Sequence, residues 1–180
     1  TLLTDEIVDV EIWSTDDRVL YTEQNFNKSN EEKRSYTYAY DTQNRQHVPV
    51  NSLNWESAVH TPDRNGRFVL VYTEKPYQKE SSWTGEIKKD LAKVDLLTGA
   101  VIPIKKGMRT NPRLSPTGKF AYGYSDIDST WWTYNLATGV FSMMNHNGLP
   151  AFYNELNDLP DYPSGYGSAG WIQDDQSFIF

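Results

Sequence analysis

Cysteine is absent from this sequence, and so is any long apolar run. Without cysteine the chain has no disulfide framework and no cysteine-based zinc or redox site. No stretch approaches the roughly 18 consecutive apolar residues that predict a transmembrane helix, so we expect no membrane span. The first residues lack an initiator Met and the basic and apolar segments of a signal peptide, so we expect no targeting signal in them.

Basic residues are scarce relative to acidic ones: the 180 residues carry 17 Lys and Arg against 24 Asp and Glu, for a net charge of −7. Because nucleic acid binding needs a basic face, nucleic acid is not expected as a partner. Aromatic residues are abundant, with 6 Trp, 12 Tyr and 7 Phe. Tyr and Trp beside many Thr, Gly, Asn and Asp residues are typical of short strands and turns. The composition therefore indicates a soluble, acidic, β-rich protein.

A turn followed by an apolar run recurs four times along the chain. Each copy places Ser, Thr, Asp, Gly or Pro before a strand-like segment, as in hairpins. The copies span residues 13–21, 61–70, 115–122 and 171–179. They repeat at a period of about 53 residues, and the first and last share Trp, Asp and Asp at the same offsets.

A second pattern falls between the copies of the first. Residues 94–101 (Val-Asp-Leu-Leu-Thr-Gly-Ala-Val) match residues 134–141 (Tyr-Asn-Leu-Ala-Thr-Gly-Val-Phe), and residues 40–45 form a weaker copy that ends in Asn-Arg. Gly at the end of such a turn adopts positive φ cheaply. Each period then holds four antiparallel strands, the content of a β-propeller blade. A β-sandwich with turns that are similar by chance is the alternative.

Alternation within the segments supports the strands. Tyr36, Tyr38 and Tyr40 alternate with small or polar residues, and the apolar residues of 8–12 alternate with Asp9 and Glu11. Such alternation is typical of half-buried strands. Both segments are thus expected to be strands.

The sequence therefore predicts an all-β fold, a partial β-propeller with about three four-stranded antiparallel blades and the start of a fourth. The expected parts are blade one at about 6–50, blade two at about 53–104, blade three at about 108–144, a rim loop at 145–168 and the start of blade four at 169–180. Complete propellers typically have 4–8 blades. We therefore expect a fragment of a longer propeller, closed by a second copy or by further chain, with open sheet edges that favour self-association.

Two stretches carry a family resemblance. Ser115-Pro116-Thr117-Gly118-Lys119 resembles the S-P-D-G-K turn of TolB-like (PD40-type) propeller repeats, with Thr where Asp is usual, and residues 95–99 fit the same repeats. Residues 162–176 are similar to the propeller of bacterial prolyl oligopeptidase-like serine peptidases (family S9). WD40 repeats are not supported, because no Trp-Asp dipeptide closes a repeat.

The peptidase resemblance implies that an α/β-hydrolase domain outside this chain carries the catalytic Ser, Asp and His. The chain itself would be non-catalytic, without a cofactor, and would gate or position peptide substrates for that domain. A periplasmic or otherwise extracytoplasmic location is then expected. Two alternatives stay open: a TolB-like propeller that serves as a protein-interaction scaffold, and a propeller enzyme that acts on polysaccharide.

Glu31 and Glu32 are candidate contacts for a substrate amine. Dipeptidyl-peptidase relatives in that family hold the substrate's free amine with a propeller Glu pair, and two carboxylates suit an ammonium group. Lys33 and Arg34 come directly after them, which is more typical of an ordinary solvated loop.

No catalytic or metal-binding set is predicted. Ser168 is not a nucleophile elbow, because G-x-S-x-G needs Gly where Tyr166 stands. A metal site would require the three widely spaced histidines, His47, His60 and His146, to converge from different blades. The acidic segments 126–130 and 157–161 lack the spacing of a calcium loop and are expected to cap turns.

Long connections are expected on one rim of the blades. In a four-stranded antiparallel blade the tight turns share one rim, and the connections at about 24–34, 75–90 and 145–168 share the other. Long loops on a rigid scaffold are where binding residues tend to lie. The aromatic candidates for substrate or partner contact in these loops are Tyr77, Trp83, Phe152, Tyr153, Tyr162 and Tyr166. The alternative is that they pack the loops onto the blades.

Overall fold

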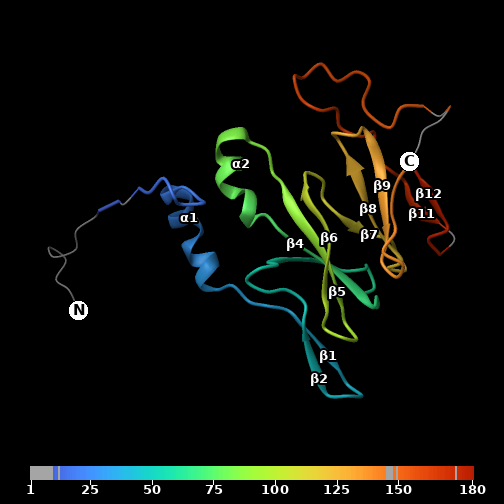
Figure 1. The fold of residues 1–180 in the computed structure, drawn as a ribbon, viewed down its shortest axis with the longest axis horizontal. Helices are drawn as coiled ribbons and strands as arrows, with labels where there is room; N and C mark the ends of the chain where they lie inside the picture. Colours follow the sequence, from blue (N-terminus) through green and yellow to red (C-terminus); the bar gives the residue numbers. More distant parts are fainter. Residues whose placement is uncertain (1–9, 12, 145–147, 149, 173) are drawn as a thin grey trace.

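Two four-stranded antiparallel sheets form the centre of the protein (Figure 1). The computed structural model describes residues 10–11, 13–144, 148, 150–172 and 174–180. The first sheet contains β3 (Ser57–Val59), β4 (Phe68–Thr73), β5 (Lys89–Asp95) and β6 (Val101–Met108). The second contains β7 (Arg113–Leu114), β8 (Phe120–Ser125), β9 (Thr130–Asn135) and β10 (Phe141–Met143). Each strand pairs with its neighbour in the chain, so both sheets are simple meanders, and the prediction of four-stranded antiparallel units is confirmed for these two.

Two-stranded hairpins flank the central sheets. One is β1 (Tyr38–Asp41) with β2 (Gln46–Pro49), and the other is β11 (Gly170–Ile172) with β12 (Ser177–Ile179). The remaining elements are α1 (Tyr21–Glu32), the short 3₁₀ helix η2 (Lys75–Tyr77) and α2 (Gln78–Thr84). None of the helices in the described residues has the length and hydropathy needed to cross a membrane.

The two central sheets pack face to face through an apolar core. Leu70 and Leu91 of the first sheet belong to the same buried cluster as Leu114 and Trp132 of the second. Consecutive residues of a strand point to opposite faces of the sheet. The neighbours of these residues therefore point away from this core, into the contacts with the two hairpins.

Those outer faces are covered as well. Val71 and Ala92 of the first sheet pack with Val48 of β2. On the far side, Trp131 of β9 packs against Trp171 and Phe178 of the β11–β12 hairpin. This cover on both faces explains why most residues of β4 and β9 are buried. Four sheets thus succeed one another face to face in chain order, as propeller blades do.

Tight turns at the ends of β5 and β9 match the second sequence pattern. Gly99 has φ +73° and Gly139 has φ +77°, as their position after Thr predicts. Arg45 takes the same place in the first hairpin with φ +55°, in the left-handed region that costs a side chain about 1 kcal/mol. Asp95 Oδ1 accepts a hydrogen bond from Leu97 N at 3.0 Å, and Asn135 Oδ1 accepts equivalent bonds in the second sheet. The expected role of glycine in these turns is confirmed.

Replacing Asp95 with Asn is expected to remove part of the acid sensitivity of folding. The hydrogen bonds from Arg67, whose Nη2 lies 2.6 Å from Asp95 Oδ2, hold the pKa of this carboxyl below its ordinary value of 3.8. A lowered pKa stabilises the fold above about pH 4, and this stabilisation is lost as pH falls through the folded-state pKa. Asn135 shows that an amide can cap the same turn, so Asp95→Asn changes mainly the charge.

Thermal unfolding of both proteins between pH 2.5 and 7 measures this effect. Asp95→Asn should melt below the wild type at pH 7, and the difference should shrink toward zero below pH ~3. A difference that is constant with pH would show that the ion pair does not contribute to the acid sensitivity.

The turns that begin β4, β8 and β12 lie in a row along one rim. A Cβ on Gly118 would lie 3.1 Å from Thr61 Cγ2, and Gly118 itself has φ +73°, so glycine suits this close approach. Thr117 N donates to Asp175 Oδ2 at 3.1 Å, and Lys119 Nζ donates to the Asp174 carbonyl at 2.8 Å. The recurring turn motif therefore supplies contacts between neighbouring sheets as well as local chain reversal.

The prediction for the first copy of this motif is wrong. Residues 19–21 were expected to form a strand and residues 24–34 a loop, but α1 begins at Tyr21 and continues to Glu32. The helix buries none of its residues. Its polar sequence has no apolar face to place against a sheet, and a helix satisfies its backbone hydrogen bonds without a neighbouring strand.

The strand expected at residues 8–12 lies largely outside the described residues. Val10 and Glu11, which are described, are not in a strand. By contrast, the last copy of the motif forms the expected hairpin, because Trp171 pairs with Phe178 across β11 and β12 and packs on the aromatic face of the second sheet.

Candidate functional site

The long connections lie on the rim opposite the row of tight turns. Residues 74–88 join β4 to β5 and carry η2 and α2, and the connection from β10 to β11 is described at residues 148 and 150–169. Both rise above the sheets in Figure 1, α2 in green and the long loop in orange. The connections β6–β7 and β8–β9 reach the same rim because successive strands are antiparallel. We call this side of the protein the loop rim.

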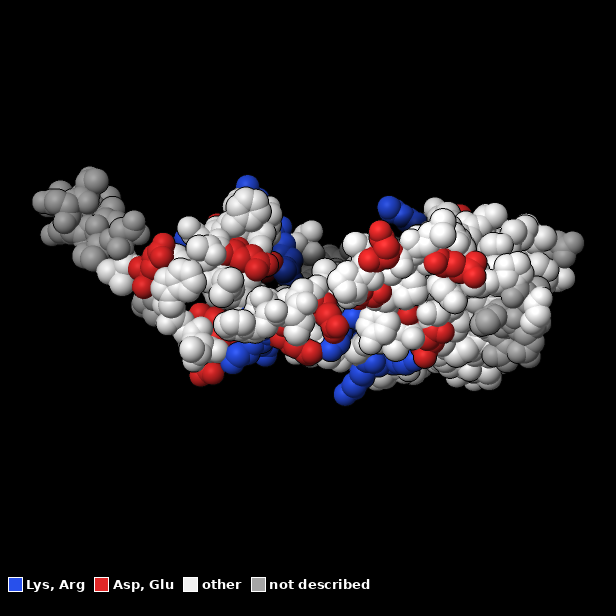
Figure 2. All heavy atoms as spheres, turned by 90° about the horizontal axis from the view of Figure 1, so that it is seen from above, with Lys and Arg blue, Asp and Glu red and all other residues white. Residues whose placement is uncertain are grey.

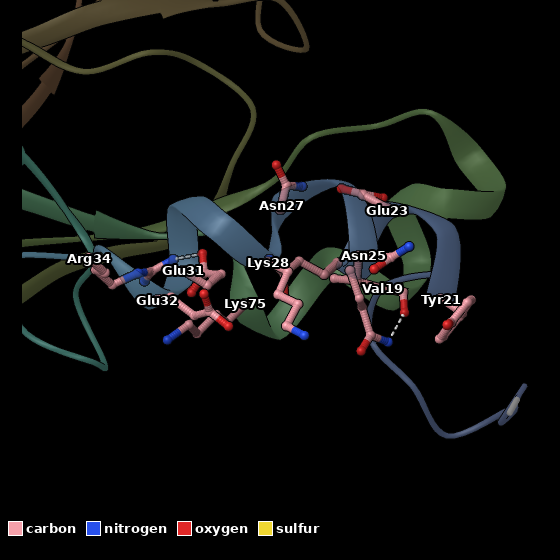
Figure 3. Close-up of a pocket in the computed structure, with 12 residues that line it drawn as sticks. Val19, Tyr21, Glu23, Asn25, Asn27, Lys28, Glu31, Glu32, Arg34 and Lys75 are labelled. Atoms are coloured by element: carbon pink, nitrogen blue, oxygen red, sulfur yellow. Dashed lines mark hydrogen bonds and ion pairs between the residues drawn. The ribbon is translucent and has the colours of Figure 1, made fainter. Parts of the chain in front are cut away.

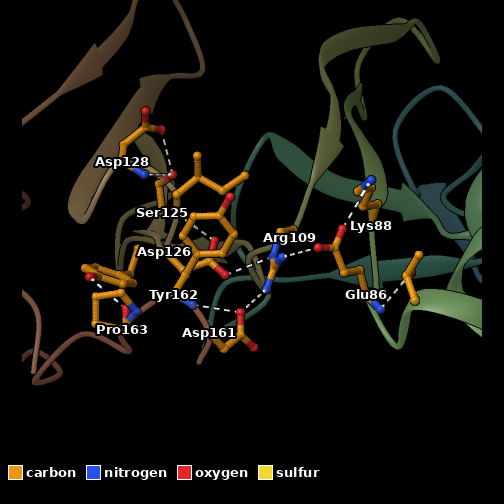
Figure 4. Close-up of polar contacts among 12 residues, drawn as sticks. Glu86, Lys88, Arg109, Ser125, Asp126, Asp128, Asp161, Tyr162 and Pro163 are labelled. Carbon is orange, nitrogen blue, oxygen red and sulfur yellow. Dashed lines mark hydrogen bonds and ion pairs between the residues drawn. The ribbon is translucent and has the colours of Figure 1, made fainter. Parts of the chain in front are cut away.

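Arg109 joins four connections of the loop rim. It lies between β6 and β7, and its Nη1 is 2.8 Å from Glu86 Oε1, in the connection before β5. Its Nε lies 2.9 Å from Asp126 Oδ2, in the β8–β9 turn, and its Nη2 lies 3.4 Å from Asp161 Oδ1, in the long loop. Figure 4 shows the three carboxylates around the guanidinium. One cation therefore ties together four segments that are far apart in the sequence.

The Arg109 guanidinium remains charged despite its burial. Its side chain is 13% exposed. Burial disfavours the charge, but the charges of Asp126, Glu86 and Asp161 outweigh that effect and raise the pKa of Arg109 above its ordinary value. The Tyr162 ring lies 5.0 Å from the guanidinium carbon and covers it. Arg109 thus acts as a fixed anchor for the long loop.

Phe152 packs the long loop down onto the sheet, and Tyr153 takes part in a backbone bridge within the loop. Phe152 is 3% exposed and belongs to the buried cluster that contains Tyr122 and Trp131. Tyr153 forms an isolated antiparallel bridge with Gly165. A Cβ at Gly165 would lie 2.9 Å from the Tyr124 ring, so the loop backbone lies directly on that ring.

A third candidate, Tyr77, is held in place by a hydrogen bond. Its hydroxyl donates to Asp90 Oδ1 at 2.6 Å, and this bond raises the pKa of Tyr77. The side chain therefore fixes η2 to the start of β5.

Three other aromatic candidates are accessible on the loop rim. Trp83 of α2 is 86% exposed, Tyr166 is 62% exposed and Tyr162 is 49% exposed. Leu156 and Leu159 in the long loop are also exposed. The loop rim therefore combines anchored segments with exposed apolar side chains.

The charge of this rim is mixed. Figure 2 looks down onto the loops and shows acidic and basic side chains interspersed, with no continuous basic area on the face in view. A phosphate backbone is bound by clustered Lys and Arg, which this face does not present.

Two hollows flank Arg109. One of about 490 Å³ lies between the α2–β5 connection and Pro160 and Asp161 of the long loop. The other, of about 340 Å³, lies between the β6–β7 connection, the β8–β9 hairpin and residues 162–165. We call the second hollow the Arg113 cavity, because Arg113 of β7 lines it.

Glu31 and Glu32 lie at the C-terminal end of α1 rather than in a loop. They line a cavity of about 610 Å³ between α1 and the η2–α2 segment (Figure 3). Glu31 forms an ion pair with Arg34, so its carboxylate is engaged next to its own helix. Lys75 lines the same cavity and donates to the Leu53 carbonyl. The structure thus surrounds the Glu pair with cations, and its role as an amine site stays a prediction.

The histidines do not meet in the described part of the chain. The His47 ring lies 4.8 Å from the Tyr40 ring, tilted against it, in the first hairpin, while His60 lies after β3, where burial first and Arg64 second lower its pKa. His146 lies outside the described residues. Among those that are described, no group of three or more His, Asp or Glu side chains is placed to hold a metal ion.

Ser168 precedes the strand β11, which begins at Gly170. A nucleophile elbow would instead place the serine between a strand and a helix. The acidic residues of segment 126–130 cap the β8–β9 turn, as expected: Asp126 Oδ1 accepts from Ile127 N at 2.9 Å, and Asp128 Oδ2 accepts from the Ser125 hydroxyl at 2.7 Å.

Sequence reasoning did not find Arg109. Asp126 and Asp161 fall in acidic turns that the sequence does single out, but their convergence on one arginine depends on contacts across three connections. Arg109 precedes Pro112 in the short link between the sheets, a position where any polar residue is typical. Its ion pairs with three carboxylates from three other connections distinguish it from the other basic residues of the described part of the chain.

This geometry defines the class of protein. The chain is mostly β with small helical content, and its antiparallel sheets, two of them four-stranded, are stacked like the blades of a partial propeller.

Comparison with known proteins gives a likeness to solved structures. No protein-family model matches the chain. No curated protein matches it either. The crystal structure of TolB from Acinetobacter baumannii is similar over 67% of this chain and 29% of that one, with 18% sequence identity and a TM-score of 0.38. The chain thus spans less than a third of the length of that structure.

Proposed function

We propose that this chain is a non-catalytic propeller segment of a prolyl oligopeptidase-like serine peptidase. Its loop rim positions or gates peptide substrates for a hydrolase domain outside the chain. The observation that carries the proposal is the Arg109 anchor: it fixes loops that present Trp83, Tyr162 and Tyr166 to the outside. Fixed aromatic side chains bind peptides at low cost in conformational entropy.

The resemblance of residues 162–176 to peptidase propellers supports this choice. That stretch contributes Tyr162 and Tyr166 to the loop rim and then enters β11. The residues that carry the resemblance therefore lie where the proposed contact takes place.

The runner-up is a protein-interaction scaffold of the TolB-like type. Exposed Leu156, Leu159 and Trp83 favour it, since exposed apolar groups on one rim also suit a protein partner. Within the described residues β1 pairs only with β2 and β12 only with β11, so both hairpins have an open edge that another strand could extend. Self-association through these edges belongs to this second proposal.

Labelling with a fluorophosphonate probe tests the peptidase proposal. The complete natural polypeptide that contains this chain is expressed and treated with the probe, which reacts with activated serine nucleophiles. A labelled band of the full-length protein, lost after heat denaturation, is expected. Failure to label a folded full-length protein would favour the scaffold.

Substitution of the exposed aromatics tests the positioning role. In the same polypeptide, Trp83→Ala and Tyr166→Ala should each lower kcat/KM for a peptide substrate by about three- to tenfold, because an aromatic contact contributes about 0.5–1.5 kcal/mol. Labelling by the probe should not change. Lys106→Gln, an exposed residue of β6, is the control. Equal kcat/KM in all three variants would contradict a contact role for the loop rim.

A further inference from the structure

The Arg113 cavity contains a cation that has no ion-pair partner among the described residues. Arg109 also lines this cavity, but Glu86, Asp126 and Asp161 already surround its charge. Arg113 forms no ion pair with any carboxylate of the described residues. Its guanidinium is therefore available to bind an anion from outside, and its planar pair of N–H groups matches the two oxygens of a carboxylate.

Two neighbouring residues add hydrogen-bond donors to the same wall. Thr110 Oγ1 accepts from Trp132 Nε1 at 3.3 Å, and Asn111 Oδ1 accepts from Lys89 Nζ at 2.7 Å. An indole N–H and an ammonium can only donate, so both oxygens are used as acceptors. The Thr110 hydroxyl hydrogen and the Asn111 amide hydrogens remain for a ligand.

The assignment of the Asn111 amide is based on its surroundings. Lys89 is 4% exposed and also pairs with Glu74 at 3.2 Å, so its ammonium is fixed in place. Its hydrogen bond therefore engages the amide oxygen of Asn111, and the NH₂ group keeps its two hydrogens for donation. With Arg113 and Thr110, this wall consists of donors, which selects for an anionic ligand over a cationic one.

The other walls of the cavity are formed by three aromatic rings together with Ser164, two glycines and Asp126, whose carboxylate pairs with Arg109. Tyr124 and Trp131 meet edge to face, with ring centroids 5.7 Å apart, and Tyr162 covers Arg109 from the long loop. The volume of about 340 Å³ lies at the lower end of the range for small-ligand sites, roughly 300–1,000 Å³. The space suits a group of one or two amino-acid residues with an apolar side chain.

We infer that the Arg113 cavity binds the free C-terminal carboxylate of a short peptide whose last side chain is apolar or aromatic. Arg113, Thr110 and Asn111 hold the carboxylate, and Tyr124, Trp131 and Tyr162 contact the side chain. The inference rests on the proposed peptide-positioning function for the choice of a peptide as ligand. The cavity and its donors belong to this chain alone, so binding requires no hydrolase domain.

Isothermal titration calorimetry with two matched probes tests the inference on the 180-residue chain. N-acetyl-Ala-Phe carries a free carboxylate, and N-acetyl-Ala-Phe-amide lacks it, while both lack a free amine. The acid should bind at least about tenfold more tightly than the amide, since hydrogen bonds to a charged group contribute about 1.5–3 kcal/mol. This comparison on the wild type does not depend on the folding of a variant.

Two variants identify the residue responsible. Arg113→Gln should weaken binding of the acid about tenfold and leave binding of the amide unchanged. Lys106→Gln removes the same charge from an exposed position outside the cavity and should change neither. Equal binding of acid and amide, an unchanged affinity in Arg113→Gln, or preference for inorganic phosphate over the acid would each overturn the inference. Serine labelling does not involve this cavity, so failure here is distinguishable from failure of the peptidase proposal.

Discussion

Replacing Trp132 with alanine is expected to lower the free energy of unfolding by about 3–5 kcal/mol, as for other fully buried aromatic residues. Trp132 is 1% exposed and stacks on Phe141 at 5.5 Å. It also forms part of the core between the two central sheets, with Leu70 and Leu91 on the opposite side. Its removal opens a cavity at the interface that holds the two four-stranded sheets together.

Gly123 shows how closely this site is packed. A Cβ at Gly123 would lie 2.9 Å from the Trp132 ring, so the indole lies directly against the backbone of β8. Neighbouring strands cannot move inward to fill the space, because backbone hydrogen bonds fix β8 beside β9. The cavity left by Trp132→Ala should therefore persist.

Urea unfolding monitored by circular dichroism measures the effect. Trp83→Ala is the matched control, since Trp83 is 86% exposed, and it should change the free energy of unfolding by less than about 0.5 kcal/mol. A loss below about 1 kcal/mol in Trp132→Ala would contradict the tight packing of the two sheets around this side chain.

Replacing Arg109 with Met is expected to cost about 2–4 kcal/mol and to release the long loop. Removing one partner of a buried ion pair leaves the other charge uncompensated, which usually costs about 3–5 kcal/mol. The expected value is lower here because Glu86 and Asp161 are 35% and 67% exposed and can recover water. Asp126, at 23% exposed, should contribute most of the loss.

Two further variants separate charge from packing. Arg109→Lys keeps the charge but loses the guanidinium geometry, so it should restore only part of the stability. Adding Asp126→Asn to Arg109→Met removes the least exposed unpaired carboxylate and should also restore part of it. If the double variant is as unstable as the sum of the single variants, the ion pair is not the cause.

Proteolysis reports on the loop separately from global stability. Residues 150–168 contain no Lys or Arg but several Tyr, Phe and Leu residues, so chymotrypsin is the suitable protease. Arg109→Met should be cleaved in this segment under conditions where the wild type is intact, because a locally opened segment is cut without global unfolding. Cleavage at the same rate in both proteins would show that Arg109 does not anchor the loop.

Trp132→Ala and Arg109→Met distinguish the role of the core between the sheets from the role of the loop rim. Trp132→Ala should weaken the contact between sheets and leave the loop anchor in place until the protein unfolds. Arg109→Met should leave the sheets packed and free the loops that we propose to contact peptide. Only the second change should reduce peptide turnover at temperatures well below the melting point.

Much of the sheet architecture could be predicted from local patterns. The Thr-Gly turns at Gly99 and Gly139 predict chain reversals at the ends of β5 and β9, because the φ values required there favour glycine. The Trp-Asp-Asp pattern near the C-terminus predicts the β11–β12 hairpin. In each case the residues that define the turn also contact each other, so the signal is local.

The same pattern failed near the N-terminus. Residues 13–21 share the Trp, Asp and Asp of the C-terminal hairpin, yet they lead into α1. The difference lies in the residues after the turn and in the surface available to them. Phe178 packs on Tyr122 and Trp131, whereas the residues after Tyr21 are mostly polar and none is buried. A strand depends on its neighbour, which a turn motif does not provide.

The candidate site was predictable only as a region. The sequence places aromatic residues in long connections, but it does not separate Phe152, which is buried, from Tyr166, which is exposed. The charge of the loop rim was similarly ambiguous, since Arg109, Arg113 and Lys88 look alike in a sequence. Burial and three acidic partners make Arg109 an anchor. Arg113 has no acidic partner among the described residues and is available for a ligand.

The tight turns could be deduced without coordinates, because they depend on residues within a few positions of one another. The four-stranded units could be deduced from the regular recurrence of those turns along the chain. Only the tertiary structure shows that Arg109 joins four connections and that Arg113 lacks an acidic partner among the described residues. It also shows that residues 21–32 form a helix. Ion pairing and burial depend on groups that only the folded chain brings together, and the spacing of those groups along the sequence does not indicate their contact.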